Sequence, residues 1–151
     1  MTLDTSVSIY KALHQKAEEA VGAKLFTIMV LDNEAGLARR AYTSHPTDYP
    51  ATGSKPMRQD RWSEQVIDNH KPFIANSTEG FSDVFSDHPL INSLGCESVL
   101  NVPVIEHHKV VGTVNFLDTK DHFTPDRVAT LQSLVAANHD ALVTALTAEL
   151  S

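Results

Sequence analysis

The residues best suited to hold a charged small molecule lie in and just after one segment, residues 45–60. Lys55 and Arg58 stand there among prolines and a glycine. Ammonium and guanidinium groups make strong, charge-assisted hydrogen bonds to carboxylates, so the pair can hold an anion over a pocket. The alternative is a solvated loop. Aromatic side chains that can wall a planar ligand occur nearby: Tyr42, Tyr49 and Trp62.

Two asparagines interrupt otherwise apolar runs. Asn101 lies within Val99–Val104 and Asn115 within Val110–Leu117. A buried amide needs a hydrogen-bond partner, which either the protein or a ligand must supply. Both asparagines are therefore candidate ligand contacts, and the alternative is that they bond within the protein.

The only cysteine, Cys96, excludes an intramolecular disulfide and a multi-cysteine zinc site. It has no adjacent histidine or cation to lower its pKa, which favours a packed, inert thiol. A nucleophilic pair with His45 or His88 stays open, because distance along the sequence does not fix distance in space. We count Cys96 among the candidate pocket residues.

Eight histidines are present, and none shows the spacing of a convincing zinc site. His70 and His88 lie close to prolines in segments that border the expected pocket. One neutral imidazole is enough to hold a haem iron, so His70 is a candidate axial ligand for haem. The alternative for each is a capping or surface histidine.

Hydrophobic periodicity predicts the elements that carry these residues. Residues 25–31 are apolar on both faces, which is typical of a central strand. Residues 94–118 read as two strands joined by a polar turn. We expect, in order, a helix over 8–21, strands over 25–31 and 37–44, a loop over 45–60, a helix over 61–69, a strand over 73–75, a loop over 76–93, the hairpin, and a helix from 125 towards 150.

Composition bounds the class of protein. The chain has 151 residues, the size of one domain, and we expect residues 1–151 to form a single domain. A net charge of −7 without a basic stripe argues against nucleic-acid binding. No segment reads as a signal peptide or a membrane span, so we expect a cytoplasmic protein.

The element order predicts an α+β domain with a central antiparallel sheet of five to six strands. Over nearly its whole length the chain resembles a GAF domain, the small-molecule-binding module of many bacterial sensors. The local markers are Lys71–Ile74, Gly95 with Ser98–Val104, and Val111–Phe116. The resemblance implies a profilin-like fold with N- and C-terminal helices on one face of the sheet. It also implies a pocket on the other face, covered by loops 45–60 and 76–93.

Particular activities of the family find little support in this sequence. Free methionine-R-sulfoxide reductases use cysteines in the pocket loops, and Cys96 has no second cysteine to resolve a disulfide. Bilin-binding members carry a histidine directly after the cysteine, where this chain has Glu97. The Asn-Lys-Phe-Asp-Glu signature of cyclic-nucleotide-binding members is absent from the sequence.

Three hypotheses follow. The first is a stand-alone sensory or regulatory domain that binds a small, anionic organic ligand. The second is a small enzyme in the same pocket, most concretely with haem at His70. The third is a structural module whose terminal helices pair in a homodimer, which is compatible with the other two.

Overall fold

The centre of the fold is a six-stranded sheet with the order β3-β2-β1-β6-β5-β4, in a computed structural model that describes residues 3–150. Every neighbouring pair is antiparallel. This arrangement confirms the predicted antiparallel α+β fold. The strands are β1 (Leu25–Asp32), β2 (Leu37–Thr43), β3 (Lys55–Pro56), β4 (Phe73–Ala75), β5 (Ser98–Glu106) and β6 (Lys109–Asp118).

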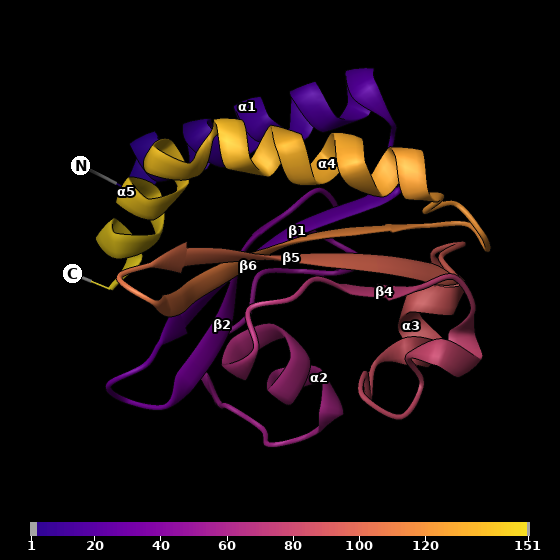
Figure 1. Cartoon of the computed structure of the whole chain (residues 1–151), viewed down its shortest axis with the longest axis horizontal. Helices are drawn as coiled ribbons and strands as arrows, with labels where there is room; N and C mark the ends of the chain where they lie inside the picture. Colours follow the sequence, from indigo (N-terminus) through magenta and orange to yellow (C-terminus); the bar gives the residue numbers. More distant parts are fainter. Residues whose placement is uncertain (1–2, 151) are drawn as a thin grey trace.

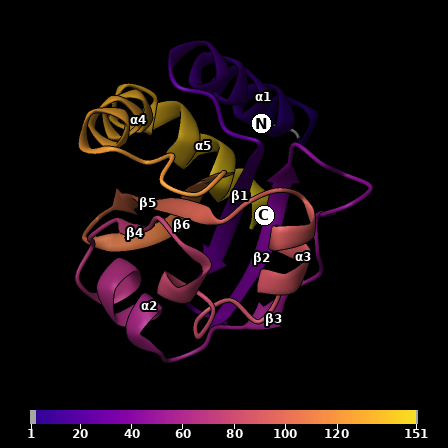
Figure 2. The same ribbon diagram turned by 90° about the vertical axis from the view of Figure 1, so that its right-hand side faces the viewer.

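Helices cover the two faces of the sheet differently (Figures 1 and 2). The long terminal helices, α1 (Leu3–Ala20), α4 (Pro125–Ala137) and α5 (His139–Glu149), lie together on one face. The other face carries the short elements α2 (Arg61–Ser63), the π-helical turn η1 (Glu64–Asp68), the 3-10 turn η2 (Thr78–Gly80) and α3 (His88–Ser93). The terminal helices therefore leave that second face to the loops.

The β5–β6 hairpin divides its side chains between these two layers. Leu100, Val102 and Val104 belong to the core beneath the terminal helices, whereas Val99 belongs to a second core beneath the loops. Successive side chains of a strand point to opposite faces. Asn101, which follows Leu100, therefore shares the loop-covered face with Val99.

Strand β1 is central, as its apolar run predicts, since it pairs with β2 on one side and β6 on the other. Its pairing with β2 contains a bulge. Ile28 lies opposite Tyr42 and Met29 opposite Arg40, so Ala41 is the extra residue. The bulge places Arg40 and Tyr42 on opposite faces, although alternation alone would place them on the same one.

The single long helix expected from residue 125 onward is two helices. The chain breaks at Asn138, whose side-chain Nδ2 donates to the carbonyl of Leu134 at 2.8 Å. The apolar positions Leu131, Val135, Leu142 and Leu146 keep helical spacing across the break, so the pattern did not reveal it.

The two segments expected to be loops also contain regular structure. Residues 45–60 include β3, which pairs with the start of β2. Residues 76–93 include η2 and α3, which begins at His88 and has Pro89 in its first turn. Proline fits a first helical turn because its missing N–H has no partner there in any case. Both segments are thus held in place rather than fully irregular.

Half of β5 forms an edge of the sheet, because β4 pairs only with Val99–Asn101. In the unpaired half, Pro103 has no N–H to offer. The carbonyl of Ile105 is already bonded, since His139 Nε2 donates to it at 2.6 Å. A donor is therefore missing at Pro103 and an acceptor is occupied at Ile105 along this open edge.

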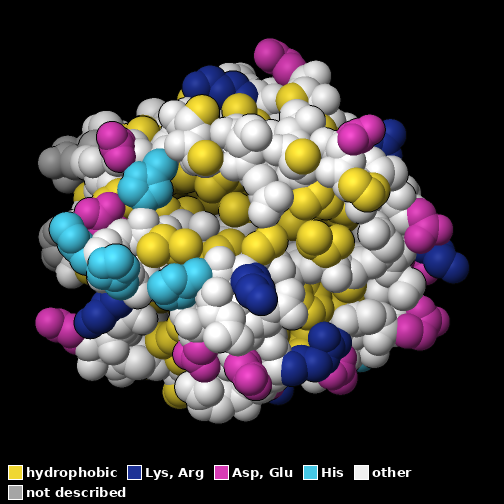
Figure 3. Space-filling model, viewed as in Figure 1, with side chains coloured by type: hydrophobic (Ala, Val, Ile, Leu, Met, Phe, Trp, Pro, Cys, Tyr) yellow, Lys and Arg dark blue, Asp and Glu magenta, His cyan; other side chains and the backbone are white. Residues whose placement is uncertain are grey.

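Apolar and histidine side chains are unevenly distributed on one face of the molecule (Figure 3). Apolar side chains form a band across the face shown in Figure 3, with histidines gathered at the end where the β5–β6 turn lies. The large apolar side chains exposed within the described residues are scattered: Val7, Ile74, Leu90 and Leu150. Homodimerisation through the terminal helices stays a prediction. None of the helices in residues 3–150 has the length and apolar character needed to cross a membrane.

Candidate functional site

A cavity of about 310 Å³ lies between the loop-covered face of the sheet and the two long segments. This volume is at the small end of the range of ligand pockets, about 300–1,000 Å³. Strands β1, β2, β5 and β6 contribute Thr27, Met29, Arg40, Asn101 and Asn115 to its lining. Both segments contribute as well, the first from Tyr49 to Asp60 and the second from Val84 to Ile91. The hollow lies between the two segments that the resemblance names as a cover, and its use as a ligand pocket stays a prediction.

A row of hydrogen-bonded side chains crosses the cavity floor. Trp62 Nε1 donates to Asn101 Oδ1 at 2.9 Å. Asn101 Nδ2 then donates to Asn115 Oδ1 at 2.8 Å, and Asn115 Nδ2 to Thr27 Oγ1 at 3.1 Å. Because Asn101, Asn115 and Thr27 lie opposite one another on β5, β6 and β1, the strand register builds this row. We call these four residues the floor row.

The direction of the floor row is fixed at one end. An indole N–H can only donate, so Asn101 must turn its oxygen towards Trp62 and its amide nitrogen towards Asn115. The same choice then follows at Asn115, whose nitrogen faces Thr27. Trp62 therefore sets the orientation of both amides, and each asparagine has a partner within the protein.

The two long segments are joined over the cavity through Arg40. Its Nη1 donates to the carbonyl of Pro50 at 2.7 Å, and its Cζ lies 3.7 Å from the centroid of the Tyr49 ring. Tyr49 in turn donates its hydroxyl proton to Asp87 on the second segment. Arg40 Nη2 lies 3.8 Å from the same Asp87 oxygen. We call Arg40, Tyr49 and Asp87 the lid clasp.

Burial supports the clasp. Desolvation, with the nearby carboxylate of Asp87, raises the pKa of Tyr49 well above its ordinary value of 10.0. Tyr49 therefore keeps its proton at physiological pH and remains a donor to Asp87. The second segment is also anchored by Phe85, whose ring centroid lies 6.4 Å from that of Trp62. The Tyr49–Asp87 hydrogen bond and the Trp62–Phe85 contact both hold the second segment over the cavity.

The charged side chains at the cavity differ in whether they already have partners within the protein. Asp60 accepts the backbone N–H of Ser63 as the N-cap of α2, and Asp87 accepts from Tyr49. Lys55 and Arg58 are exposed, and within residues 3–150 neither forms an ion pair. The carboxylates are therefore occupied while two cations remain available.

Arg39 also borders the cavity, but its guanidinium bonds to the layer of terminal helices on the opposite face of the sheet. Its Nη2 donates to Glu149 Oε2 at 2.7 Å and to the backbone carbonyl of Glu149 at 3.0 Å. The side chain of Glu149 is only 5% exposed and also accepts the hydroxyl of Tyr10 at 3.3 Å. This bonding joins β2 to α1 and α5 and leaves Arg39 committed away from the cavity.

Six of the sequence-predicted ligand contacts line this cavity: Tyr49, Lys55, Arg58, Trp62, Asn101 and Asn115. Tyr42 does not. The β2 bulge turns its ring to the terminal helices, where it lies 6.0 Å from the ring of Tyr10 and 5.8 Å from that of Phe26. Tyr42 was expected at the pocket as an aromatic wall, and the extra residue Ala41 in β2 instead places it on the face opposite to Arg40.

Cys96 is also absent from the cavity lining. It lies fully buried in the core beneath the loops, two residues before the start of β5. Desolvation, with a contribution from Asp118, raises the pKa of its thiol to about 11. A thiolate is the nucleophilic form, so this environment makes Cys96 a packing residue rather than a reactive one.

The residues present do not fit haem. His70 follows η1 with φ of 59°, a left-handed position at the end of a helical segment, and it does not line the cavity. His88 Nδ1 contacts the carbonyl of Phe85 at 3.0 Å. No histidine belongs to the cavity lining in the described part of the chain. The expectation of a haem iron on His70 is therefore not supported by the geometry.

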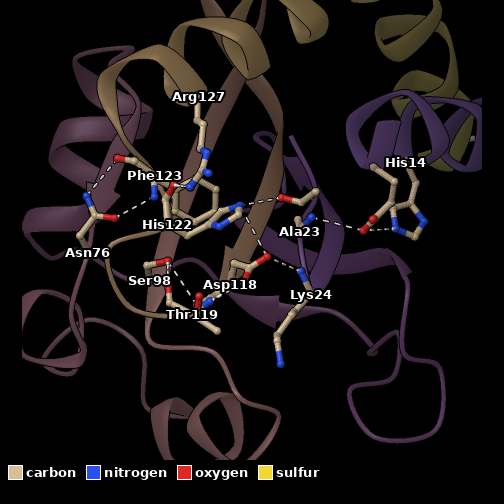
Figure 4. Close-up of polar contacts among 12 residues, drawn as sticks. His14, Ala23, Lys24, Asn76, Ser98, Asp118, Thr119, His122, Phe123 and Arg127 are labelled. Atoms are coloured by element: carbon tan, nitrogen blue, oxygen red, sulfur yellow. Dashed lines mark hydrogen bonds and ion pairs between the residues drawn. The ribbon is translucent and has the colours of Figure 1, made fainter. Parts of the chain in front are cut away.

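A second polar cluster resembles a catalytic dyad but bonds inward (Figure 4). His122 Nε2 lies 3.6 Å from Asp118 Oδ2 and contacts the carbonyl of Gly22 at 2.8 Å. Asp118 Oδ2 also accepts the backbone N–H of Lys24 at 3.0 Å, and Oδ1 that of Thr119. These bonds fasten the loop before α4 to the junction of α1 and β1, so the cluster serves the scaffold.

Several cavity residues were missed by sequence reasoning, notably Thr27, Arg40 and Asp87. Thr27 is the one hydroxyl-bearing residue in the apolar run of β1, and that interruption was the available signal. Arg40 was obscured by its neighbour Arg39, because the sequence does not tell which of two adjacent arginines faces the pocket. Asp87 carried no distinctive pattern.

Comparison with known proteins agrees with this architecture. A family model described as the GAF domain matches residues 5–142. A search of the curated proteins finds no match. Among solved structures, the chain is similar to the GAF domain of a two-component sensor histidine kinase from Bacillus halodurans. That pair has a TM-score of 0.72 at 20% identity and covers 97% of this chain and 95% of the other.

Two further solved structures show how widely this fold is shared. A GAF domain/HD domain protein from Geobacter sulfurreducens has a TM-score of 0.71 at 14% identity, covering 91% of this chain and 92% of that one. A type II free methionine-R-sulfoxide reductase from Thermoplasma acidophilum has a TM-score of 0.67 at 15% identity, covering 97% and 96%. At such identities the likeness establishes the fold alone. GAF domains are typically sensory domains that bind small molecules, and this chain belongs to the GAF domain family.

Proposed function

We propose that this domain is a receptor for a small organic anion, held in the cavity beneath residues 45–60 and 76–93. The observation that carries the proposal is the state of the charges there. Lys55 and Arg58 border the cavity without an ion pair in the described residues, while Asp60 and Asp87 already accept hydrogen bonds from the protein. An anionic ligand is the chemistry that this imbalance favours.

The lid clasp supports a regulatory role for binding. Both covering segments meet at Arg40, which is bonded to Pro50 and stacked on Tyr49 of the first segment and lies 3.8 Å from Asp87 of the second. An anion that enters the cavity competes with Asp87 for this guanidinium. Occupancy therefore changes how the two segments are tied together, and a sensor needs such a change to report its ligand.

The proposal is tested by titrating the protein with small carboxylates such as acetate, benzoate, hexanoate and adipate. Trp62, the single tryptophan, lies in the floor row and reports binding through its fluorescence. Thermal unfolding is the second readout. A ligand at about 100 times its Kd stabilises the native state by about 2.7 kcal/mol, which raises Tm by roughly 5–10 °C in a domain of this size.

Charge variants separate specific from general effects. The double variant Lys55→Gln, Arg58→Gln should weaken binding of every carboxylate. The matched control is Lys11→Gln, Lys120→Gln, which removes two exposed cations elsewhere and should bind as the wild type does. Equal affinities in the two double variants, or no response of the wild type to any acid, would refute the proposal.

A further inference from the structure

The floor row has more hydrogen-bond donors than its internal bonds use. The hydroxyl oxygen of Thr27 accepts from Asn115, and its proton has no acceptor among the described residues. Each asparagine amide donates one of its two protons within the row. Three protons thus remain, on side chains that line the cavity and are at least nine-tenths buried.

The oxygens of the floor row, unlike these three protons, already take part in hydrogen bonds. Asn101 Oδ1, Asn115 Oδ1 and Thr27 Oγ1 each accept one hydrogen bond already. An unused second lone pair costs less than an unpaired buried donor, and it is more often seen in proteins. The floor therefore calls for a ligand atom that accepts.

That acceptor should be neutral. Thr27, Asn101, Asn115 and Trp62 are all uncharged, and the neighbouring floor residues Met29 and Val99 are apolar. A carboxylate placed here would be desolvated without a cation beside it, which is costly. A carbonyl oxygen accepts the same protons without that cost. The cations that a carboxylate can reach lie at the cover: Lys55 and Arg58, and the guanidinium of Arg40 against Pro50 and Tyr49.

Resting on the proposed function, we propose that the ligand is a short carboxylic acid with a carbonyl group at its other end. Its carboxylate is held by Lys55 and Arg58, and its carbonyl oxygen accepts from Thr27 and the amides of the floor row. The apolar chain between the two groups contacts Met29, Leu31 and Leu117. The volume holds about ten waters at roughly 30 Å³ each, which suits so small a molecule.

A matched series of acids tests this assignment on the wild-type protein. Hexanoate carries the carboxylate alone, and 5-oxohexanoate adds the carbonyl. Adipate replaces the carbonyl with a second anion, and 6-aminohexanoate replaces it with a cationic donor. We expect the Kd of 5-oxohexanoate, measured by Trp62 fluorescence, to be roughly fivefold to tenfold lower than that of hexanoate. This ratio corresponds to one net hydrogen bond. Adipate and 6-aminohexanoate should bind more weakly than 5-oxohexanoate.

Variants of Thr27 test whether its hydroxyl is responsible for the preference for 5-oxohexanoate. Thr27→Val keeps the shape but removes the hydroxyl, so the preference for 5-oxohexanoate over hexanoate should fall towards one. Thr27→Ser keeps the hydroxyl and should keep the preference. Because the readout is a ratio of two affinities in one protein, a general loss of stability in Thr27→Val does not imitate it.

The outcomes distinguish this inference from the proposal beneath it. If hexanoate and 5-oxohexanoate bind wild type equally well, or adipate binds best, the carbonyl assignment is overturned while the anion receptor stands. If Thr27→Val keeps the full preference, the Thr27 hydroxyl does not donate to the carbonyl, and the assignment as stated is overturned. If no acid binds at all, the receptor proposal itself fails.

Discussion

Replacing Arg40 with glutamine should loosen the cover of the cavity without unfolding the domain. The guanidinium donates to the Pro50 carbonyl at 2.7 Å and lies 3.7 Å from the centre of the Tyr49 ring. Glutamine is uncharged and too short to keep both contacts. Residues 45–60 then lose the side-chain contacts of Arg40 at Tyr49 and Pro50, while the pairing of β3 with β2, the rest of the sheet and both cores are kept.

The size of the effect follows from these contacts. A hydrogen bond from a charged donor contributes about 1.5 kcal/mol at the low end of its range, and the cation–π contact about 1 kcal/mol. The 3.8 Å approach to Asp87 adds little, because that carboxylate is 36% exposed. Allowing for the 20% exposure of the Arg40 side chain, we expect a loss of about 2 kcal/mol, or roughly a 30-fold rise in loop opening.

Amide hydrogen exchange measures this opening residue by residue. The N–H of Tyr49 donates to the carbonyl of His45 at 2.8 Å, so its exchange reports the segment itself. Amides in β1 and β6 report global unfolding in the same experiment. Arg58→Gln is the matched control, because it removes an exposed cation from the same segment and breaks no ion pair or hydrogen bond found among the described residues. Unchanged exchange at Tyr49 in Arg40→Gln would refute the clasp.

Three further outcomes are expected. Gly112→Ala should lower the free energy of unfolding, measured in urea, by about 1–3 kcal/mol, because the new Cβ would lie 2.5 Å from the Met29 carbonyl. Gly53 has open space around it, so Gly53→Ala is the control and should be nearly neutral. Cys96, with its pKa raised to about 11, should resist a thiol reagent at pH 8 in the native state and react once the protein is unfolded; rapid native labelling would contradict its burial. The hydrogen bond to the Ile105 carbonyl, then the hydrogen bond to Asp140 and the charges of Asp140 and Glu106, raise the pKa of His139 above 6.5. The stabilising effect of His139 is therefore full below pH 6.5 and is lost as the pH rises through the folded-state pKa. The stability deficit of His139→Gln should shrink from pH 6 to pH 9, and a constant deficit would exclude this linkage.

The sequence predicted the elements that are long enough to show a clear hydrophobic pattern. The β5–β6 hairpin and the central position of β1 follow from β-branched and apolar runs around turn residues. The cover was predicted as two loops because prolines and glycines interrupt both segments. The two-residue strand β3 and the short helix α3 within them are too brief to leave a periodic pattern.

The rest of the site depends on contacts that composition does not encode. One extra residue in β2, Ala41, decides that Arg40 faces the cavity and Tyr42 the helices. The floor row depends on register across three strands and on the approach of Trp62 from a segment 39 residues away from Asn101. The lid clasp brings together Tyr49 and Asp87, which are 38 residues apart. Such pairings arise from tertiary packing, which periodicity does not reveal.

The edges of the sheet bear on how this protein behaves at high concentration. One edge is β3, only two residues long, with an exposed lysine and a proline. At the other edge β4 is short, Pro103 supplies no donor, and His139 occupies the Ile105 carbonyl. Strand-by-strand growth into fibrils needs long edges with free donors and acceptors. We therefore expect concentrated solutions to stay free of amyloid-like polymers, with any self-association confined to side-chain surfaces.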